Sequence, residues 1–263
     1  MSRRCHIAPW VLAGVASLVS GAAFGQLPDC RAISLDPAAY KVVLGEVSAP
    51  GEASRERDAI RDQLRFKLRT QAESLQLAAE QRQLRSVVCE GRAPEDESVF
   101  SGNTLDDLSR LGVVMEVWGS VRPAAGATGA AATREAHLNF AVISLLRFEP
   151  TLGGFFDLNF VTPAGTSADV VLKDNVELEA LATLAVAVRY RRDRRYDVSA
   201  RTFCEAQSHI ARSAQQAAGT EAARWTALRD YATASRAALV KEALADPQYT
   251  GGLRVSGARG CLP

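Results

Sequence analysis

The stretch LDDLSRLGVVMEVWGSV, residues 105–121, decides the fold of the first half of this 263-residue chain. Its leucines recur at helical spacing, and Thr104 with Asp107 forms a capping-box-like pair at the start of the helix. Gly112 ends the helix, because glycine readily adopts the left-handed backbone that closes a last turn. The valine-rich run that follows, residues 113–121, predicts a strand directly after the helix.

Short strands are expected on both sides of this stretch. Residues 40–47 (YKVVLGEV) and 84–89 (LRSVVC) are runs typical of strands. Between them, apolar side chains recur every three or four residues over residues 55–79, which is the pattern of an amphipathic helix. Residues 136–146 and 156–160 alternate apolar with polar side chains and predict an antiparallel meander. The element order therefore predicts an α/β layer with a mixed sheet, β-α-β-α-β plus the meander.

The second half is rich in alanine and is predicted to be all helical. Two helices flank a charged turn at residues 191–195, and a covering helix is expected over residues 221–245. The fold class predicted for the whole chain is therefore α+β. An α/β domain is expected over residues 26–168, and a helical domain with a C-terminal tail over residues 174–263.

The two helices around the charged turn resemble a tetratricopeptide repeat, a pair of antiparallel helices of about 34 residues. In that pattern small residues let the helices approach, and aromatic residues fill the gap between them. The matching positions are Ala187, Tyr190, Tyr196, Ser199, Phe203 and Ala206. The resemblance implies that the hairpin leans on the first domain or on a partner, since a free-standing array normally needs about three repeats. An ordinary three-helix layer without repeat ancestry is the alternative.

Residues 105–121 also resemble the helix–glycine–strand–glycine segment of the α/β domain that begins the Tol-system β-propeller protein. A similar segment occurs in the curli-secretion lipoprotein, and the order of elements is similar over residues 40–161. This resemblance implies a shared fold and carries little about shared activity.

The N-terminus has the features of a cleaved signal peptide over residues 1–25. Arg3 and Arg4 give a positive start, and residues 7–24 carry only small, apolar or hydroxyl side chains. Small residues precede the expected cleavage after Gly25, which makes the mature protein periplasmic. An uncleaved anchor is the alternative, and both the general and the twin-arginine export routes stay open. No second apolar run of membrane length follows in the sequence.

The cysteines that remain after removal of the signal are Cys30, Cys89, Cys204 and Cys261. An even number in an oxidising compartment indicates two disulfides. The favoured pairing links Cys30 to Cys89 and Cys204 to Cys261, so that each half of the chain has its own disulfide. Four cysteines allow three pairings. Their wide spacing disfavours zinc, which prefers close pairs such as C-x-x-C.

The overall charge does not favour binding to nucleic acid or anionic lipid. Cleavage after Gly25 removes two of the 31 basic residues and leaves 29 against 30 acidic ones. Nucleic acid is therefore not an expected partner.

Patterns for catalysis or metal binding are absent from the sequence, which has no nucleophile elbow, P-loop, zincin or Rossmann glycine motif. His137 and His209 have no ligand spacing around them and are expected to be ordinary packed or surface residues. We therefore expect no metal, no cofactor and no enzyme activity.

The charged turn is the one conspicuous cluster of like charges. Its candidate binding residues are Arg191, Arg192, Arg194 and Arg195. Arginines at the end of a helix can simply neutralise its C-terminus and solvate the turn. The sharper hypothesis is a site for an acidic partner, or for a phosphate or carboxylate of the cell envelope.

These observations favour a non-enzymatic, periplasmic protein-binding accessory or adaptor of the bacterial cell envelope. Its partner would be another envelope protein. The alternative is a periplasmic small-ligand-binding sensor, with a pocket at the strand ends near residues 47–51 and 90–94. The sequence indicates neither the oligomeric state nor the identity of the partner.

Overall fold

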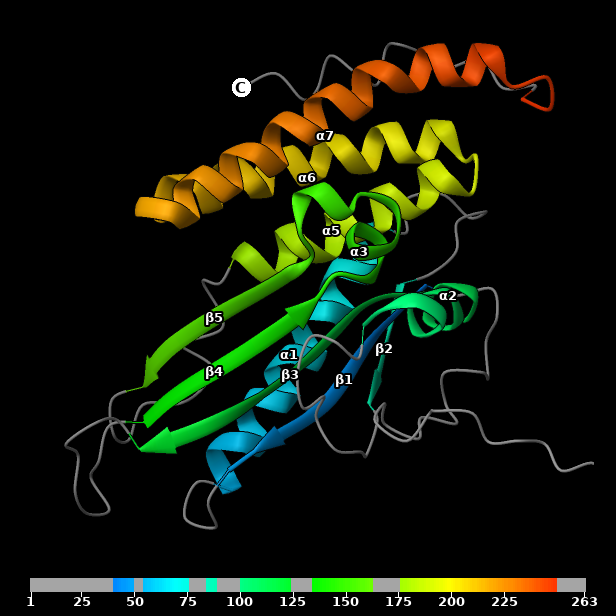
Figure 1. The fold of residues 1–263 in the computed structure, drawn as a ribbon. Helices are drawn as coiled ribbons and strands as arrows, with labels where there is room; N and C mark the ends of the chain where they lie inside the picture. The colour runs from blue at the N-terminus through cyan, green and yellow to red at the C-terminus, as the bar shows by residue number, and fades with distance from the viewer. Residues whose placement is uncertain are drawn as a thin grey trace, which may run out of the picture.

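The structure is a computed structural model that describes residues 40–49, 54–75, 84–88, 100–123, 134–162 and 176–249. It confirms the α+β class. A mixed sheet carries helices on both faces, and three long helices stack over one end of it (Figure 1).

The five described strands form one sheet in the order β2-β1-β3-β4-β5. Their bounds are Tyr40–Ser48 for β1, Leu84–Val88 for β2, Val113–Pro123 for β3, Arg134–Ala141 for β4 and Phe155–Thr162 for β5. β1 runs parallel to β2 and β3, whereas β4 lies antiparallel between β3 and β5. Parallel neighbours need a crossover connection, and helices α1 (Ser54–Leu75) and α2 (Gly102–Arg110) lie in the two crossovers.

The two faces of the sheet are covered differently, because successive side chains of a strand point to opposite faces. On one face, Val42 lies in the same apolar cluster as Ile60 of α1. On the other face, Val43 shares a smaller cluster with Leu108 of α2, which the short helix α3 (Ile143–Phe148) completes.

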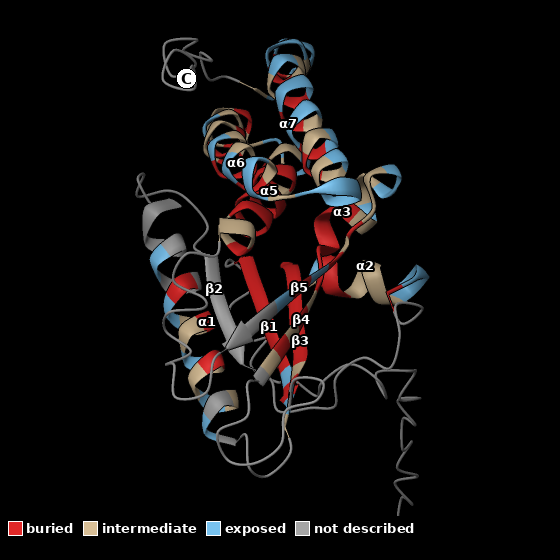
Figure 2. Cartoon of the chain, turned by 90° about the vertical axis from the view of Figure 1, so that its left-hand side faces the viewer, coloured by how far each residue is buried: buried red, intermediate tan, exposed pale blue. Residues whose placement is uncertain are grey.

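The helical layer consists of α5 (Val176–Arg192), α6 (Tyr196–Gln216) and α7 (Gly219–Ala245). α5 is buried over nearly its whole length, since it lies between the α/β layer and α6 (Figure 2). A helix that is apolar on all sides is stable only in such a position. The larger apolar cluster continues from the sheet through all three helices. No helix in the described ranges is long and apolar enough to cross a membrane.

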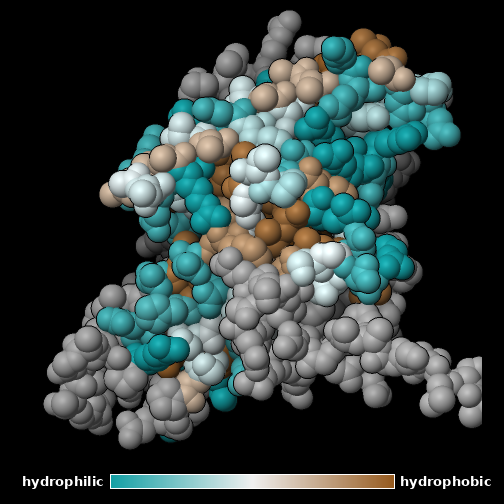
Figure 3. Space-filling model, viewed as in Figure 1, coloured by the Kyte–Doolittle hydropathy of each residue, from teal (hydrophilic) through white to brown (hydrophobic). Residues whose placement is uncertain are grey.

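A polar network joins the C-terminal end of α5 to the sheet. Tyr40 donates from its hydroxyl to Asp193 at 2.6 Å, and Asp193 lies 3.2 Å from Nε of Arg189. Arg189 in turn donates to the carbonyl of Ser109 at 2.9 Å. The helical layer is therefore attached to β1 and α2 by hydrogen bonds as well as by apolar packing. On the face drawn in Figure 3, apolar surface gathers where the helices meet the sheet.

The predicted order of elements is confirmed, but the strand expected over residues 136–146 is wrong in its second half. β4 ends at Ala141, and residues 143–148 form α3. Ile143 is buried in the smaller cluster and Leu145 in the larger one, so this short segment is covered on both sides. A short apolar run of this kind fits a buried strand and a buried helix equally well.

The predicted capping pair of α2 is also wrong. The helix begins at Gly102, after Ser101 in an extended conformation, and no side chain caps it. Thr104 therefore lies inside the first turn, and Asp107 pairs with Arg110 in the last. Gly112 follows the helix with a φ of 79°, as its left-handed role requires.

Candidate docking site at the arginine turn

The arginine turn, residues 191–195, closes α5 by a Schellman motif. The N–H of Arg195 donates to the carbonyl of Tyr190 at 2.9 Å, and the N–H of Arg194 donates to that of Arg191 at 3.1 Å. These two hydrogen bonds define the motif and satisfy carbonyls that a helix end leaves open. The guanidinium of Arg195 lies 5.7 Å from the centre of the Tyr190 ring, where the motif usually has an apolar contact.

Arg194 occupies the position of this motif that glycine usually occupies. Its φ is 57°, and within the described residues it is the one non-glycine residue with a positive φ. The left-handed conformation costs a residue with a Cβ atom roughly 1–2 kcal/mol. The side chain of Arg194 is 62% exposed, so burial does not compensate for that cost.

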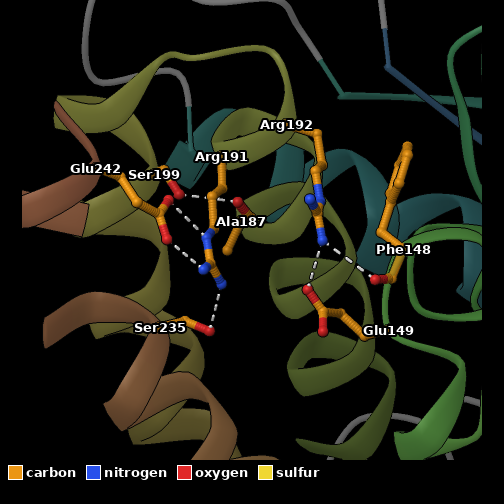
Figure 4. A network of polar contacts seen from close by, with 8 residues as sticks. All are labelled: Phe148, Glu149, Ala187, Arg191, Arg192, Ser199, Ser235 and Glu242. Atoms are coloured by element: carbon orange, nitrogen blue, oxygen red, sulfur yellow. Dashed lines mark hydrogen bonds and ion pairs between the residues drawn. The ribbon is translucent and has the colours of Figure 1, made fainter. Parts of the chain in front are cut away.

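Arg191 points inward and joins α5 to α7 (Figure 4). Its guanidinium pairs with both carboxylate oxygens of Glu242, with Nε 2.9 Å from Oε2, and donates to the hydroxyl of Ser235 at 2.9 Å. The hydrogen bond with Glu242 is the main reason that the pKa of Arg191 lies above its usual value. The side chain is only 19% exposed, so Arg191 is engaged inside the protein and is not freely available to a partner.

Arg192 joins α5 to the segment that follows α3. It donates to the carboxylate of Glu149 at 2.9 Å and to the carbonyl of Phe148 at 3.2 Å (Figure 4). Its guanidinium also lies 5.4 Å from the centre of the Phe148 ring. The side chain remains 44% exposed, so this arginine is held in place without being removed from solvent.

With the residues that the structure describes, Arg194 makes only long contacts. Its guanidinium lies 3.6 Å from the carboxylate of Asp246 and 3.4 Å from the side-chain oxygen of Gln248. Asp246 already accepts hydrogen bonds from the backbone of Gln248 at 2.9 Å and the hydroxyl of Tyr196 at 3.0 Å. The backbone hydrogen bond of Gln248 is the first cause that holds the pKa of Asp246 below its usual value, with Tyr196 and Arg194 adding to it.

These side chains surround an open pocket of about 430 Å³, hereafter the arginine pocket. Its lining residues are Arg191, Arg192, Arg194, Tyr196, Glu242, Ala245, Asp246 and Pro247. Three of the four predicted binding arginines thus line one surface pocket. Arg195 does not, because its guanidinium lies over Tyr190.

The sequence did not indicate the acidic side of this pocket. Glu242 and Asp246 come from the end of α7, about fifty residues beyond the arginines they contact. Their spacing of four residues at the end of a predicted helix was a weak signal, because such carboxylates are usually solvated.

The six predicted helix-packing positions are all buried: Ala187, Tyr190, Tyr196, Ser199, Phe203 and Ala206. Ser199 of α6 donates from its hydroxyl to the carbonyl of Ala187 on α5 at 2.9 Å (Figure 4). Burial of small and aromatic residues fits any closely packed helical hairpin. The tetratricopeptide resemblance therefore stays a prediction.

Several predicted features lie outside the described residues. These are the signal peptide, the strand-end loops proposed for a small-ligand pocket beyond residue 49, and the cysteines Cys30, Cys89 and Cys261. Cys204 lies half-buried on α6 and is disulfide-bonded. The pairing of the four cysteines stays a prediction.

His209 is a packed residue with acidic neighbours. Its Nδ1 lies 3.4 Å from Glu179 of α5, and its Nε2 lies 3.8 Å from Glu205 of α6. Lys67 of α1 lies 3.9 Å from the same Glu179 carboxylate. Burial lowers the pKa of His209, but the interactions with Glu179 and Glu205 outweigh it, so the pKa lies above its usual value. His137 is half-exposed on β4, 3.6 Å from Glu135.

Glu116 is a buried acid that the sequence reasoning did not single out. It lies on β3 opposite Val43 of β1 and Ala141 of β4, and only 1% of it is exposed. Within the described part of the chain, neither carboxylate oxygen has a hydrogen-bond partner. Burial raises its pKa to about 8, so Glu116 is protonated at neutral pH. The signal that could have revealed it is a lone charge within the apolar run VVMEVW.

The fold and the site define an α+β protein whose helical layer carries an arginine-lined surface pocket. No protein-family model and no curated protein matches the chain. Two solved structures of the PelC dodecamer from Paraburkholderia phytofirmans resemble part of it. One is 10% identical and covers 55% of this chain and 89% of its own, with a TM-score of 0.30. The other is 8% identical and covers 54% and 90%, with the same TM-score. Similarity at this level assigns neither fold nor function.

Proposed function

We propose that the mature protein is a non-enzymatic accessory or adaptor of the bacterial cell envelope that binds another protein in the periplasm. The observation that carries this proposal is the arginine pocket, which is open to solvent on the helical layer. Arginine guanidinium groups recognise carboxylates bidentately, and they are enriched at protein–protein interfaces.

Two further features support the proposal. The signal-like N-terminus gives the expected address, and the sequence offers no constellation for catalysis. Part of the pocket lining is also held in place, because Arg191 fixes the end of α5 to α7 and Arg192 fixes it to the segment after α3. Arg191 and Arg192, held in this way, lose little freedom when a partner docks.

The proposal is tested by capture of partners from envelope extract with the full mature chain as bait. The variant is the double substitution of Arg192→Gln and Arg194→Gln, which leaves Arg191 and its contact with α7 intact. The control is Arg201→Gln with Arg229→Gln, two exposed arginines that do not line the pocket. We expect the pocket variant to lose a partner that the wild type and the control retain.

Added salt should weaken the same capture, because exposed ion pairs are screened. Absence of any specific partner, or equal capture by both double variants, would contradict the proposal.

A further inference from the structure

We infer that the arginine pocket is a carboxylate-binding site, in which Arg194 binds one acidic side chain of a partner's peptide segment. This inference rests on the proposed function and names the chemistry of its partner. Three independent observations carry it: the engagement of each arginine, the charge of the lining, and the backbone conformation at Arg194.

The first observation is that Arg194 alone among the lining arginines is held by no close ion pair. Arg191 is already paired with both oxygens of Glu242, and Arg192 donates to Glu149 at 2.9 Å. The contacts of Arg194 are 3.6 Å and 3.4 Å, and its side chain is the most exposed of the three. Arg194 can therefore turn toward a new carboxylate while Asp246 keeps its hydrogen bonds from Gln248 and Tyr196.

The second observation is the charge of the lining, which selects the kind of anion. Three arginines and two acids line the pocket, and Glu149 pairs with Arg192 from outside the lining, so the cluster as a whole is close to neutral. A group with a single negative charge therefore adds the least excess charge. A phosphate monoester carries about −1.5 to −2 at neutral pH, and Glu242 and Asp246 would repel the excess. The pocket therefore favours a carboxylate over a phosphate.

The third observation is the left-handed backbone of Arg194. Glycine would close the Schellman motif without strain, and the Arg194 side chain is mostly exposed, so burial does not offset the strain. Backbone strain that the surrounding structure imposes clusters at active sites and ligand-binding positions. The presence of arginine here is explained if its side chain has a task in binding.

The backbone also supplies a variant that separates binding from folding. Arg194→Gly removes the guanidinium and relieves the left-handed strain, so its melting temperature should equal or exceed that of the wild type. A loss of binding in this variant cannot result from a loosened fold. Arg194→Gln tests the charge alone, and Arg201→Gln serves as the matched control because Arg201 is exposed on α6.

The probe is a fluorescently labelled hexaglutamate peptide, and binding to the full mature chain is followed by fluorescence anisotropy. We expect the wild type and Arg201→Gln to bind alike. Arg194→Gly and Arg194→Gln should each bind about tenfold or more weakly, as the loss of a charge-assisted pair predicts. Acetate should displace the probe at lower concentration than inorganic phosphate does at equal ionic strength.

Three results would overturn the inference: no binding of hexaglutamate by the wild type, equal weakening by the Arg194 and Arg201 variants, or stronger displacement by phosphate. The proposed adaptor function fails separately. If the wild type captures an envelope partner but does not bind hexaglutamate, the adaptor function is supported and the carboxylate-binding site is contradicted. If hexaglutamate binds through Arg194 but no envelope partner is captured, the carboxylate-binding site is supported and the adaptor function is contradicted.

Discussion

Glu116 and Arg191 are both charged residues within the packed part of the molecule, but their surroundings differ. Neither oxygen of Glu116 has a hydrogen-bond partner among the described residues, whereas Arg191 is paired with Glu242 and Ser235. An unpaired buried carboxylate takes up a proton, while a paired guanidinium keeps its charge. Substitution should therefore stabilise the protein at the first residue and destabilise it at the second.

We predict that Glu116→Gln stabilises the fold at neutral pH. The ordinary pKa of this acid is 4.5, and burial raises it to about 8 in the folded state. Below the ordinary value both states are protonated, and ionisation of Glu116 does not affect stability. As the pH rises from there toward the raised pKa, the unfolded state ionises and the folded state does not, so stability falls.

At pH 7 the gain from Glu116→Gln should therefore reach roughly 3 kcal/mol, and it should vanish near pH 4. Urea unfolding across this pH range measures it. Glu135→Gln, at a half-exposed position of β4, is the control and should give little change at any pH. A gain that does not depend on pH would show that Glu116 is not the titrating group.

We predict that Arg191→Gln lowers the free energy of unfolding by about 2 kcal/mol, the usual range for hydrogen bonds to charged groups. The substitution breaks the connection between the end of α5 and α7. Arg194→Gln should change stability by less than about 0.5 kcal/mol, because its contacts are long and exposed. A double-mutant cycle with Glu242→Gln isolates the pair, and a coupling energy near zero would contradict its structural role.

At the scale of the elements, the sequence predicted those whose signal is local. The helices around the arginine turn and the strands β1, β3 and β5 follow from periodicity and from glycine or charged residues at their ends. The short helix α3 was not predicted, because its buried residues belong to both apolar clusters and its six residues show no period that separates helix from strand. The local sequence pattern carries no information about which distant elements pack on such a segment.

The candidate site was predictable only on its basic side. The arginine turn is one contiguous segment, so its charge is visible in the sequence. Glu242 and Asp246 reach it through the packing of α7 on α5 and α6, which no local pattern encodes. Glu116 was visible as a lone charge, but its missing partners depend on the cover that α2 and α3 give to that face of the sheet.

We predict a pH dependence from the contact among α1, α5 and α6. The raised pKa of His209 means that its stabilising effect is complete below its ordinary value of 6.5 and is lost as the pH rises through the raised value. The hydrogen bond from His209 is the main cause that lowers the pKa of Glu179, with Lys67 and Arg212 contributing. The effect of Glu179 is present above its ordinary pKa of 4.5 and is lost on further acidification.

Melting temperatures from about pH 5 to pH 9 should therefore fall on the alkaline side for the wild type, and less so for His209→Gln. His137→Gln, at a half-exposed histidine of β4, is the matched control. Parallel curves for the wild type and His209→Gln would contradict a role for this cluster in stability.

At the scale of the whole molecule, the sheet and the helical layer share one apolar core. α5 is the connecting element, because its apolar residues belong to the same cluster as those of β1, β3 and β4. The predicted boundary between the two domains, residues 168–174, lies outside the described residues. The shared core, together with the network from Tyr40 to Asp193, favours one cooperative unit over two independent ones.

We predict that the oxidised mature protein unfolds in a single transition. Leu181→Ala on α5 removes a fully buried side chain and should lower the free energy of unfolding by about 2–5 kcal/mol. Because α5 packs on the sheet, the substitution should shift the helical signal and the environment of Trp118 together. Far-ultraviolet circular dichroism follows the first, and tryptophan fluorescence, with Trp225→Phe to isolate the strand residue, follows the second. If the helical signal melted first while Trp118 stayed in its folded environment, the helical layer would be a separate folding unit that only rests on the sheet.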